Sequence, residues 1–361
     1  MSSYWNERIK NLSPYVPGEQ PKDRQFIKLN TNENPYPPSP KVIEAIKNAA
    51  DDRLRLYPDP ECTDFRKAIA QRYGVKLEQV FAGNGSDEIL AFAFGAFFES
   101  ENKSCCDKAL PVLFPDITYS FYPVYANLWN IPYNLVPLQD NFSIKVSDYK
   151  TPSGGAILPN PNAPTGIALS LDEVLSIAEF MESQKKVFIV DEAYIAFGTQ
   201  SAISYIKKFP NLLVVHTLSK SASLAGLRAG FAVGDEKLIE GLCRIRDSFN
   251  SYTLDRLALA GAKAAIEDAS YYEDMNKKVA DTRERTVKVL TELGFTILPS
   301  SANFVFIKHS KTSGAQLFAK LREGGVLVRH FNKNRIADFL RISIGTDDEM
   351  DKFLVVCREI I

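Results

Sequence analysis

The hydrophobic positions of this chain fall into short runs that alternate with amphipathic segments. Short apolar runs that end abruptly predict buried strands over residues 80–82, 109–114, 155–158, 187–190 and 212–215. Segments with helical periodicity lie between them, over residues 40–50, 64–73, 89–98 and 172–183. This repeated β–α order predicts an α/β fold with a mostly parallel central sheet between helices.

The pattern changes after Val233. Charge-rich helical segments fill residues 235–293, including a long helix over about 268–293 that Gly294 ends. Strand-like runs over 304–307, 326–328 and 340–344, with a helix over about 314–322, predict a smaller α+β unit. We therefore expect a large domain over 41–245 and a small C-terminal domain over 246–361. The proline-rich residues 1–40 are expected to form an arm that joins the small domain or a dimer contact.

Composition excludes several classes of protein. The chain has 361 residues, of which 45% are hydrophobic and 24% charged, with a net charge of −1. These values argue against a disordered chain or a strongly nucleic-acid-binding one. No apolar run has transmembrane length, and the first residues do not form a secretory signal. We expect a cytoplasmic protein with no membrane or nucleic-acid partner.

Cysteine and histidine spacing predicts no disulfide framework and no metal. The five cysteines are Cys62, Cys105, Cys106, Cys243 and Cys357, an odd number without framework spacing. The three histidines, His216, His309 and His330, are far apart and form no ligand motif.

The candidate chemistry lies just after the predicted strands. Lys220 follows one strand among small residues, a setting that lowers an amine's pKa, and Asp191 ends another strand, where a carboxylate needs a cationic partner. Arg228 offers a planar fork suited to phosphate. Residues 83–88 (Gly-Asn-Gly-Ser-Asp-Glu) open a helix and predict an anion site. They do not complete GxGxxG, which argues against a nicotinamide dehydrogenase.

Each of these features alone has a plainer interpretation. Lys220 could be a solvated lysine, Arg228 a salt-bridge partner, the glycine turn an ordinary helix cap and Tyr119 a core residue. Together, a nucleophilic lysine, a buried aspartate, a tyrosine, a helix start and an arginine fit the cofactor pyridoxal phosphate.

The motifs resemble those of fold-type I aminotransferases, most closely the histidinol-phosphate aminotransferase family. The matching segments keep the family's order and are residues 29–36 (Leu-Asn-Thr-Asn-Glu-Asn-Pro-Tyr), 57–59, 83–88, 160–166 (Asn-Pro-Asn-Ala-Pro-Thr-Gly), 190–194, 217–228 and 339–346. The resemblance implies the aspartate aminotransferase-like fold of the pyridoxal-phosphate-dependent transferases and a homodimer.

The resemblance also implies roles for particular residues. Lys220 would form the Schiff base, Asp191 would hold the ring nitrogen, Tyr194 the ring hydroxyl, and Tyr119 would stack on the ring. The cofactor phosphate would bind Gly85, Ser86, Asp87, Ser219 and Arg228, with Tyr57 reaching it from the neighbouring subunit. One position departs from the family: an asparagine often precedes Pro-Thr-Gly, but here it is Ala163. Either Asn160 or Asn162 takes that role, or Tyr194 acts with less help.

The implied substrate site is formed by Arg341, Arg329, Tyr15, Tyr57 and Asn34. The implied reaction converts histidinol phosphate and 2-oxoglutarate to imidazole acetol phosphate and glutamate. The same scaffold also allows an aromatic amino-acid aminotransferase or a phosphoamino-acid decarboxylase. An alternative of another class is a non-catalytic binding or regulatory module with this fold.

Overall fold

The structure is a computed structural model that describes residues 3–6, 9–10, 12–16, 18–21, 25–101 and 109–361. Within them, the largest sheet contains β2 (Val80–Gly83), β3 (Val112–Pro115), β4 (Tyr133–Val136), β5 (Gly155–Pro159), β6 (Phe188–Asp191), β7 (Leu212–Thr217) and β8 (Gly230–Val233). The strand order is β2-β8-β7-β6-β5-β3-β4. Every neighbouring pair is parallel except the two that β8 makes. The expected α/β class with a mostly parallel sheet is confirmed.

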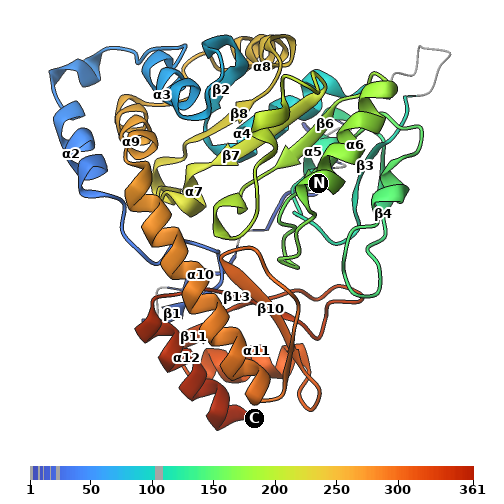
Figure 1. Ribbon diagram of the computed structural model, residues 1–361, viewed down its shortest axis with the longest axis vertical. Helices are drawn as coiled ribbons and strands as arrows, with labels where there is room; N and C mark the ends of the chain where they lie inside the picture. Colours follow the sequence, from blue (N-terminus) through green and yellow to red (C-terminus); the bar gives the residue numbers. More distant parts are fainter. Residues whose placement is uncertain (1–2, 7–8, 11, 17, 22–24, 102–108) are drawn as a thin grey trace.

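Helices cover both faces of this sheet (Figure 1). They are α2 (Pro40–Ala49), α3 (Thr63–Tyr73), α4 (Gly85–Phe97), α5 (Tyr122–Trp129), α6 (Leu171–Ser183), α8 (Glu236–Phe249) and α9 (Arg256–Glu267). Ile189 and Leu213 pack in a cluster with α4, α5 and α8. Their neighbours Val190 and Val214 pack in a second cluster with α3, α6 and α9. Because successive strand residues point to opposite faces, the continuous apolar runs reflect burial on both sides.

Local signals set the ends of several helices. Ser39 caps α2 and Pro40 is its first residue, while Gly74 ends α3 in the left-handed conformation. Ser170 and Glu173 form a capping box at the start of α6. The predicted helix over 89–98 begins earlier, at Gly85, so the glycine turn is itself the first turn of α4.

The long helix α10 (Ala269–Glu292) runs from the large sheet to a smaller α+β unit (Figure 1). Within the described residues, four antiparallel strands form its sheet in the order β12-β13-β10-β9. The strands are β9 (Phe295–Ile297), β10 (Phe304–His309), β12 (Arg329–His330) and β13 (Leu340–Ser343), and the accompanying helices are α11 (Gly314–Glu323) and α12 (Asp347–Ile360). Leu317 of α11 and Phe353 of α12 are fully buried in the core beneath this sheet.

The N-terminal arm joins this smaller unit through a strand that the sequence pattern did not predict. β1 (Ile27–Lys28) pairs in parallel with β11 (Val326–Leu327), the strand expected over 326–328. The chain then runs from β1 through residues 29–34 into the space between the two sheets, and it reaches α2 only afterwards. This route brings the arm to the site described below.

Short helical turns complete the described chain. They are α7 (Leu218–Ser221), η1 (Asp52–Arg55), η2 (Leu77–Gln79), η3 (Val146–Tyr149), η4 (Ile195–Phe197), η5 (Ala202–Tyr205) and η6 (Ala225–Leu227). No helix among the described residues is both long and apolar enough to cross a membrane. Cys105 and Cys106 lie outside the described residues, and Cys62, Cys243 and Cys357 are free thiols.

The expected domain boundaries remain a proposal. α9 follows the expected division after residue 245, yet it packs against α2 and α3, which belong to the large half. The long α10, rather than residue 245, is the segment that connects the two sheets in space (Figure 1).

Candidate active site

A cavity of about 370 Å³ opens where β5, β6 and β7 end. Parallel α/β sheets bind ligands at this edge. Three parts of the chain line it: the arm, the ends of the large-sheet strands, and the strands β12 and β13. The sequence-predicted residues in its lining are Tyr15, Ser86, Asp87, Tyr119, Asp191, Tyr194, Ser219, Lys220, Arg228, Arg329 and Arg341.

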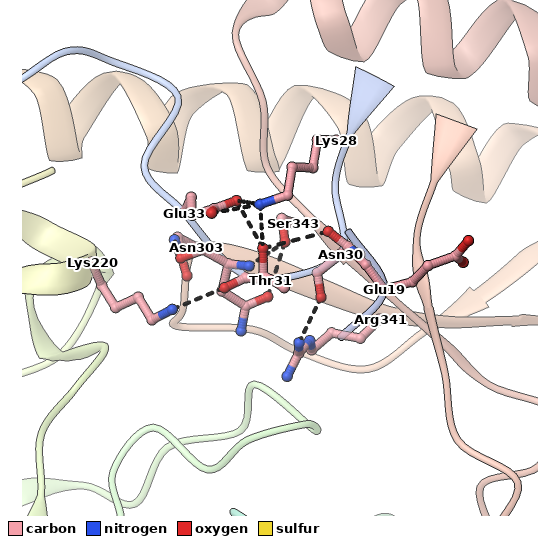
Figure 2. Close-up of polar contacts among 10 residues, drawn as sticks. Glu19, Lys28, Asn30, Thr31, Glu33, Lys220, Asn303, Arg341 and Ser343 are labelled. Carbon is pink, nitrogen blue, oxygen red and sulfur yellow. Dashed lines mark hydrogen bonds and ion pairs between the residues drawn. The ribbon is translucent and has the colours of Figure 1, made fainter. Parts of the chain in front are cut away.

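Lys220 lies on α7, directly after β7. The hydroxyl of Thr217 accepts a hydrogen bond from the amide of Ser219 at 3.1 Å and starts this turn. The Lys220 amine donates to the carbonyl oxygen of Thr31 at 2.9 Å (Figure 2). Burial, with the charge of Arg341, lowers the pKa of Lys220 to about 8. A substantial neutral fraction near that pH makes the amine a usable nucleophile and base.

Asp191 ends β6 and is only 4% exposed. Its carboxylate accepts hydrogen bonds from the hydroxyl of Tyr122 at 3.0 Å and from the amide of Ala193 at 3.2 Å. Burial raises the pKa of Asp191 to about 6 despite these bonds. Among the described residues Asp191 has no ion-pair partner, so its carboxylate suits a cationic group of a ligand.

The start of α4 and Arg228 form a cradle for an anion. A Cβ added at Gly85 would lie 2.7 Å from Nη2 of Arg228, so only glycine lets the guanidinium lie this close. Arg228 donates to the hydroxyl of Ser219 at 3.2 Å and to the carboxylate of Asp87 at 3.1 Å. The helix start, the hydroxyl and the guanidinium converge, which is the chemistry of a phosphate site.

Two further arginines face the cavity from the smaller sheet. Arg329 of β12 pairs with Arg341 of β13 in the strand register. Neither forms an ion pair among the residues that the structure describes. Arg341 donates to the carbonyl oxygen of Asn30 at 3.0 Å (Figure 2), while its buried Nε has no hydrogen-bond partner. Burial and the nearby Arg329 lower the pKa of Arg341. Two close cations without counter-ions predict a second anion site.

The other predicted site residues lie outside the cavity lining. Asn160 exchanges hydrogen bonds with the main chain of Leu169, and Asn162 donates to Ile117 and Thr165. These amides support the loop after β5, which leaves Tyr194 as the partner that the geometry favours for a ring hydroxyl. Gly85 lies against the guanidinium of Arg228 and does not line the cavity itself.

Asn34 and Tyr57 are also outside the lining. Asn34 donates to the carbonyl oxygen of Lys220 at 3.0 Å and to the side chain of Asn276 at 3.2 Å, so it holds the lysine's backbone. Tyr57 is 81% exposed, with its ring stacked on Tyr252 at a centroid distance of 4.6 Å. An exposed position fits a residue that serves a neighbouring subunit, and that role remains a prediction.

The arm contributes cavity residues that sequence reasoning did not assign. They are Gly18, Gln20, Asn30, Thr31, Asn32 and Glu33, and Ala163 lines the cavity as well. The segment over 29–36 was singled out as a motif, and a lining role at a site or a subunit contact was left open for residues 30–34, but only Asn34 was assigned to the substrate site. No group of three or more metal-ligating side chains lies close together in the described part of the chain.

Known proteins resemble this chain in sequence and in fold. Residues 24–356 match the sequence model of the family described as aminotransferase class I and II. The chain is 54% identical over 361 residues to the histidinol-phosphate aminotransferase of Clostridium acetobutylicum, covering 100% of both chains. The Sinorhizobium meliloti histidinol-phosphate aminotransferase, solved in complex with pyridoxal-5′-phosphate, has a TM-score of 0.88 at 24% identity, covering 100% of this chain and 99% of that one.

The fold extends to more distant enzymes. A mutant of Thermus thermophilus aspartate aminotransferase has a TM-score of 0.82 at 17% identity, with 100% of both chains covered. The expected aspartate aminotransferase-like fold is confirmed by this likeness.

Proposed function

The chain belongs to the class I and II aminotransferase family, and from that premise we propose that it is a histidinol-phosphate transaminase using pyridoxal phosphate. It would convert histidinol phosphate and 2-oxoglutarate to imidazole acetol phosphate and glutamate, a step of histidine biosynthesis. Full-length identity of 54% to a relative with that name supports the substrate. The observation that carries the proposal is the arrangement of cations around one lysine, because Lys220 lines the same cavity as Arg228 and as the pair Arg329 and Arg341.

The residues present fit pyridoxal phosphate. The cradle of Ser86, Ser219 and Arg228 suits its phosphate, and the absence of a side chain at Gly85 lets the Arg228 guanidinium lie against the start of α4. The buried carboxylate of Asp191, which forms no ion pair among the described residues, suits a protonated ring nitrogen. Tyr119 lies in the lining with its hydroxyl tied to Asp87 at 2.6 Å, which holds its ring beside the cavity.

When bound, pyridoxal phosphate supplies an aldehyde that bonds amines and a ring that delocalises the electron pair left when a carbon loses its proton. Lys220 Nζ is the amine that would hold the cofactor. The neutral Nζ would take the proton from the substrate carbon that bears the amino group. The Asp191 carboxylate would stabilise a positive charge on the ring nitrogen and so favour its protonated form.

Arg329 and Arg341 would bind the substrates. The phosphate of histidinol phosphate and the carboxylates of 2-oxoglutarate and glutamate are both anions with oxygen pairs that match a guanidinium fork. The two arginines would therefore bind the amino donor and 2-oxoglutarate in the same place. Tyr15 lines the same cavity. We also propose a homodimer in which Tyr57 reaches the neighbouring site. The expected cytoplasmic location remains a prediction.

The test is the visible spectrum of the purified protein, loaded with pyridoxal phosphate, before and after each amino donor is added. We expect the cofactor band to bleach with histidinol phosphate far more readily than with phenylalanine, and glutamate to form when 2-oxoglutarate follows. The Lys220→Ala variant is the control and should neither show the lysine-bound band nor form glutamate.

Other outcomes would replace the proposal. Bleaching with phenylalanine at equal or lower concentration would assign an aromatic aminotransferase. Release of carbon dioxide from a phosphoamino acid without need for 2-oxoglutarate would assign a decarboxylase. A protein that stays colourless with pyridoxal phosphate would contradict the roles of Lys220, Asp191 and Arg228.

A further inference from the structure

The hydroxyl of Tyr194 is held by an amide from the N-terminal arm. Nδ2 of Asn32 donates to the Tyr194 hydroxyl oxygen at 3.0 Å, across 162 residues of sequence. Asn32 is 1% exposed and Tyr194 is 8% exposed, yet both line the cavity that contains Lys220. The contact is therefore desolvated and lies at the wall of the site, where hydrogen-bond polarity matters most.

The polarity of this contact follows from the groups behind it. The main-chain amide of Asn32 donates to the hydroxyl of Ser343 at 2.8 Å, so that hydroxyl has its own proton left to donate. It donates this proton to Oδ1 of Asn32 at 3.0 Å. With Oδ1 accepting the proton of Ser343, the Asn32 side chain presents its NH₂ group to Tyr194.

The backbone of Asn32 is fixed as well. Asn303 donates to its carbonyl oxygen at 3.0 Å, and Asn303 directly precedes β10. The φ angle of Asn32 is 56°, a left-handed conformation that asparagine and aspartate tolerate better than other side chains with a Cβ. Ser343 of β13 therefore orients the side-chain amide of Asn32, and Asn303 beside β10 holds its main chain.

An amide donor on the Tyr194 oxygen leaves the tyrosine's own proton free. Burial raises the pKa of Tyr194, so the phenol keeps that proton. The neighbouring wall residue at the Pro-Thr-Gly turn is Ala163, whose side chain has no donor. The Tyr194 hydroxyl is then the group at this wall that is set to donate into the cavity.

We propose that Asn32 is a positioning residue that forces Tyr194 to act as a hydrogen-bond donor toward the ring hydroxyl oxygen of the cofactor. This inference rests on the proposed cofactor, and it assigns to the arm the support that Ala163 cannot give. Asn32 acts through Tyr194 and Ser343 rather than on the reacting atoms.

The decisive substitution is Asn32→Asp. It keeps the size, the tolerance of the left-handed backbone and the acceptor for Ser343, but its carboxylate cannot donate. Tyr194 would then turn its proton toward this carboxylate and away from the cavity. Without that donor, the ring oxygen would carry more negative charge and would hold the proton on the cofactor-bearing Lys220 nitrogen more tightly. The pKa of that nitrogen would therefore rise. We expect the pH midpoint of the cofactor's visible band to rise by about one to two pH units.

A double-mutant cycle separates this mechanism from a simple charge effect. In the Tyr194→Phe background the midpoint should already be raised, and adding Asn32→Asp should move it little further. Ser343→Ala removes the hydroxyl that donates to Oδ1 of Asn32, so the side-chain amide can rotate by half a turn. This variant should raise the midpoint less than Asn32→Asp does. Thermal unfolding of each apoprotein checks that the variants fold.

An Asn32→Asp shift of equal size in both backgrounds would overturn the proposal, because an added charge would then account for it. An unmoved midpoint in a folded, coloured variant would overturn it too, while leaving the proposed function intact. The measurement uses no amino donor, so an error in the substrate does not affect it. A wild-type protein with no cofactor band at all would overturn this inference and the proposed function together.

Discussion

Asp191 and Lys220 have opposite charges, and burial acts on both in favour of the neutral form. The pKa of the carboxyl rises to about 6 and that of the amine falls to about 8. Neither group has an ion-pair partner among the described residues. A ligand with a cationic ring nitrogen would offset the desolvation of Asp191, which gives the site a reason to bind such a ring.

The Asp191 carboxylate should therefore destabilise the apoprotein at neutral pH. Its pKa is raised from the ordinary value of 3.8 to about 6 in the folded protein. Below pH 3.8 the carboxyl is protonated in both the folded and the unfolded chain, so its burial costs no stability. This stability is lost as pH rises through about 6, where the buried group becomes charged. We expect Asp191→Asn to increase the apoprotein's free energy of unfolding at pH 7.5 by up to about 3 kcal/mol. Urea unfolding at a series of pH values measures this, and the gain should shrink as pH falls toward 4.

The control for this substitution is the exposed Asp140, where Asp140→Asn should change the unfolding free energy little at any pH. A less stable Asp191→Asn apoprotein across the whole pH range would show that the carboxylate's hydrogen bonds outweigh its burial. The same variant should bind pyridoxal phosphate more weakly, since it loses the charge that holds the ring nitrogen.

At the scale of elements, β12 and β13 decide where the substrate's anion can bind. The register that sets Arg329 opposite Arg341 places two cations on adjacent strands, and the β1–β11 pair brings the carbonyl oxygen of Asn30 against Arg341. Two neighbouring guanidinium groups repel each other electrostatically, and an anionic ligand bound between them would offset that repulsion.

Removing either charge should weaken substrate use. A charge-assisted hydrogen bond contributes about 1.5–3 kcal/mol, so Arg329→Gln and Arg341→Gln should each lower kcat/KM for histidinol phosphate roughly 10- to 100-fold. Arg341→Lys should recover only part of the loss, because an ammonium lacks the planar fork. Steady-state kinetics with both substrates measures these effects.

Arg244→Gln is the matched control, because Arg244 is exposed, pairs with Glu240, and is not among the residues that line the cavity. Its kcat/KM should stay within twofold of the wild type. If Arg329→Gln and Arg341→Gln behave like this control, the second anion site does not bind the substrate.

At the scale of the whole molecule, large apolar or aromatic side chains are exposed around Tyr57 in the chain and against it in space. Leu54 and Leu56 shortly precede Tyr57 in the sequence, and the exposed Tyr252 stacks on it. Exposed aromatic groups of this kind suit an interface between two copies. The proposed dimer would cover them and carry Tyr57 into the neighbouring site.

Mixed dimers test this arrangement. Tyr57→Ala and Lys220→Ala homodimers should each be impaired, but a mixed dimer has one site with an intact Lys220 and the partner's intact Tyr57. After subunit exchange of equal amounts, roughly a quarter of all sites should be intact, and activity should rise toward that level. Activity that stays at the average of the two parents would mean that Tyr57 serves its own subunit or none.

Local chemistry explains which parts of this protein the sequence alone determined. The buried strands of the large sheet, the helices between them and the residues after each strand follow from side-chain periodicity, which depends on neighbours a few positions apart. The motif of Lys220, Asp191 and Arg228 was readable for the same reason. Short elements were missed: β1, β4, β8, β9, β12 and α5 were not individually predicted, since a few residues give too little periodic signal. The 14-residue helix α12 was not predicted either, although Thr346 and Glu349 form a capping box at its start.

Only the tertiary structure decided how the arm meets the site. Asn32 contacts Tyr194 across 162 residues, and the carbonyl of Thr31 meets Lys220 across 189. No local pattern encodes such pairs, because they depend on how β1 docks on β11 and how the smaller sheet packs beside the larger one. The sequence therefore determined which groups carry the chemistry, and packing determined that asparagines of the arm would orient them.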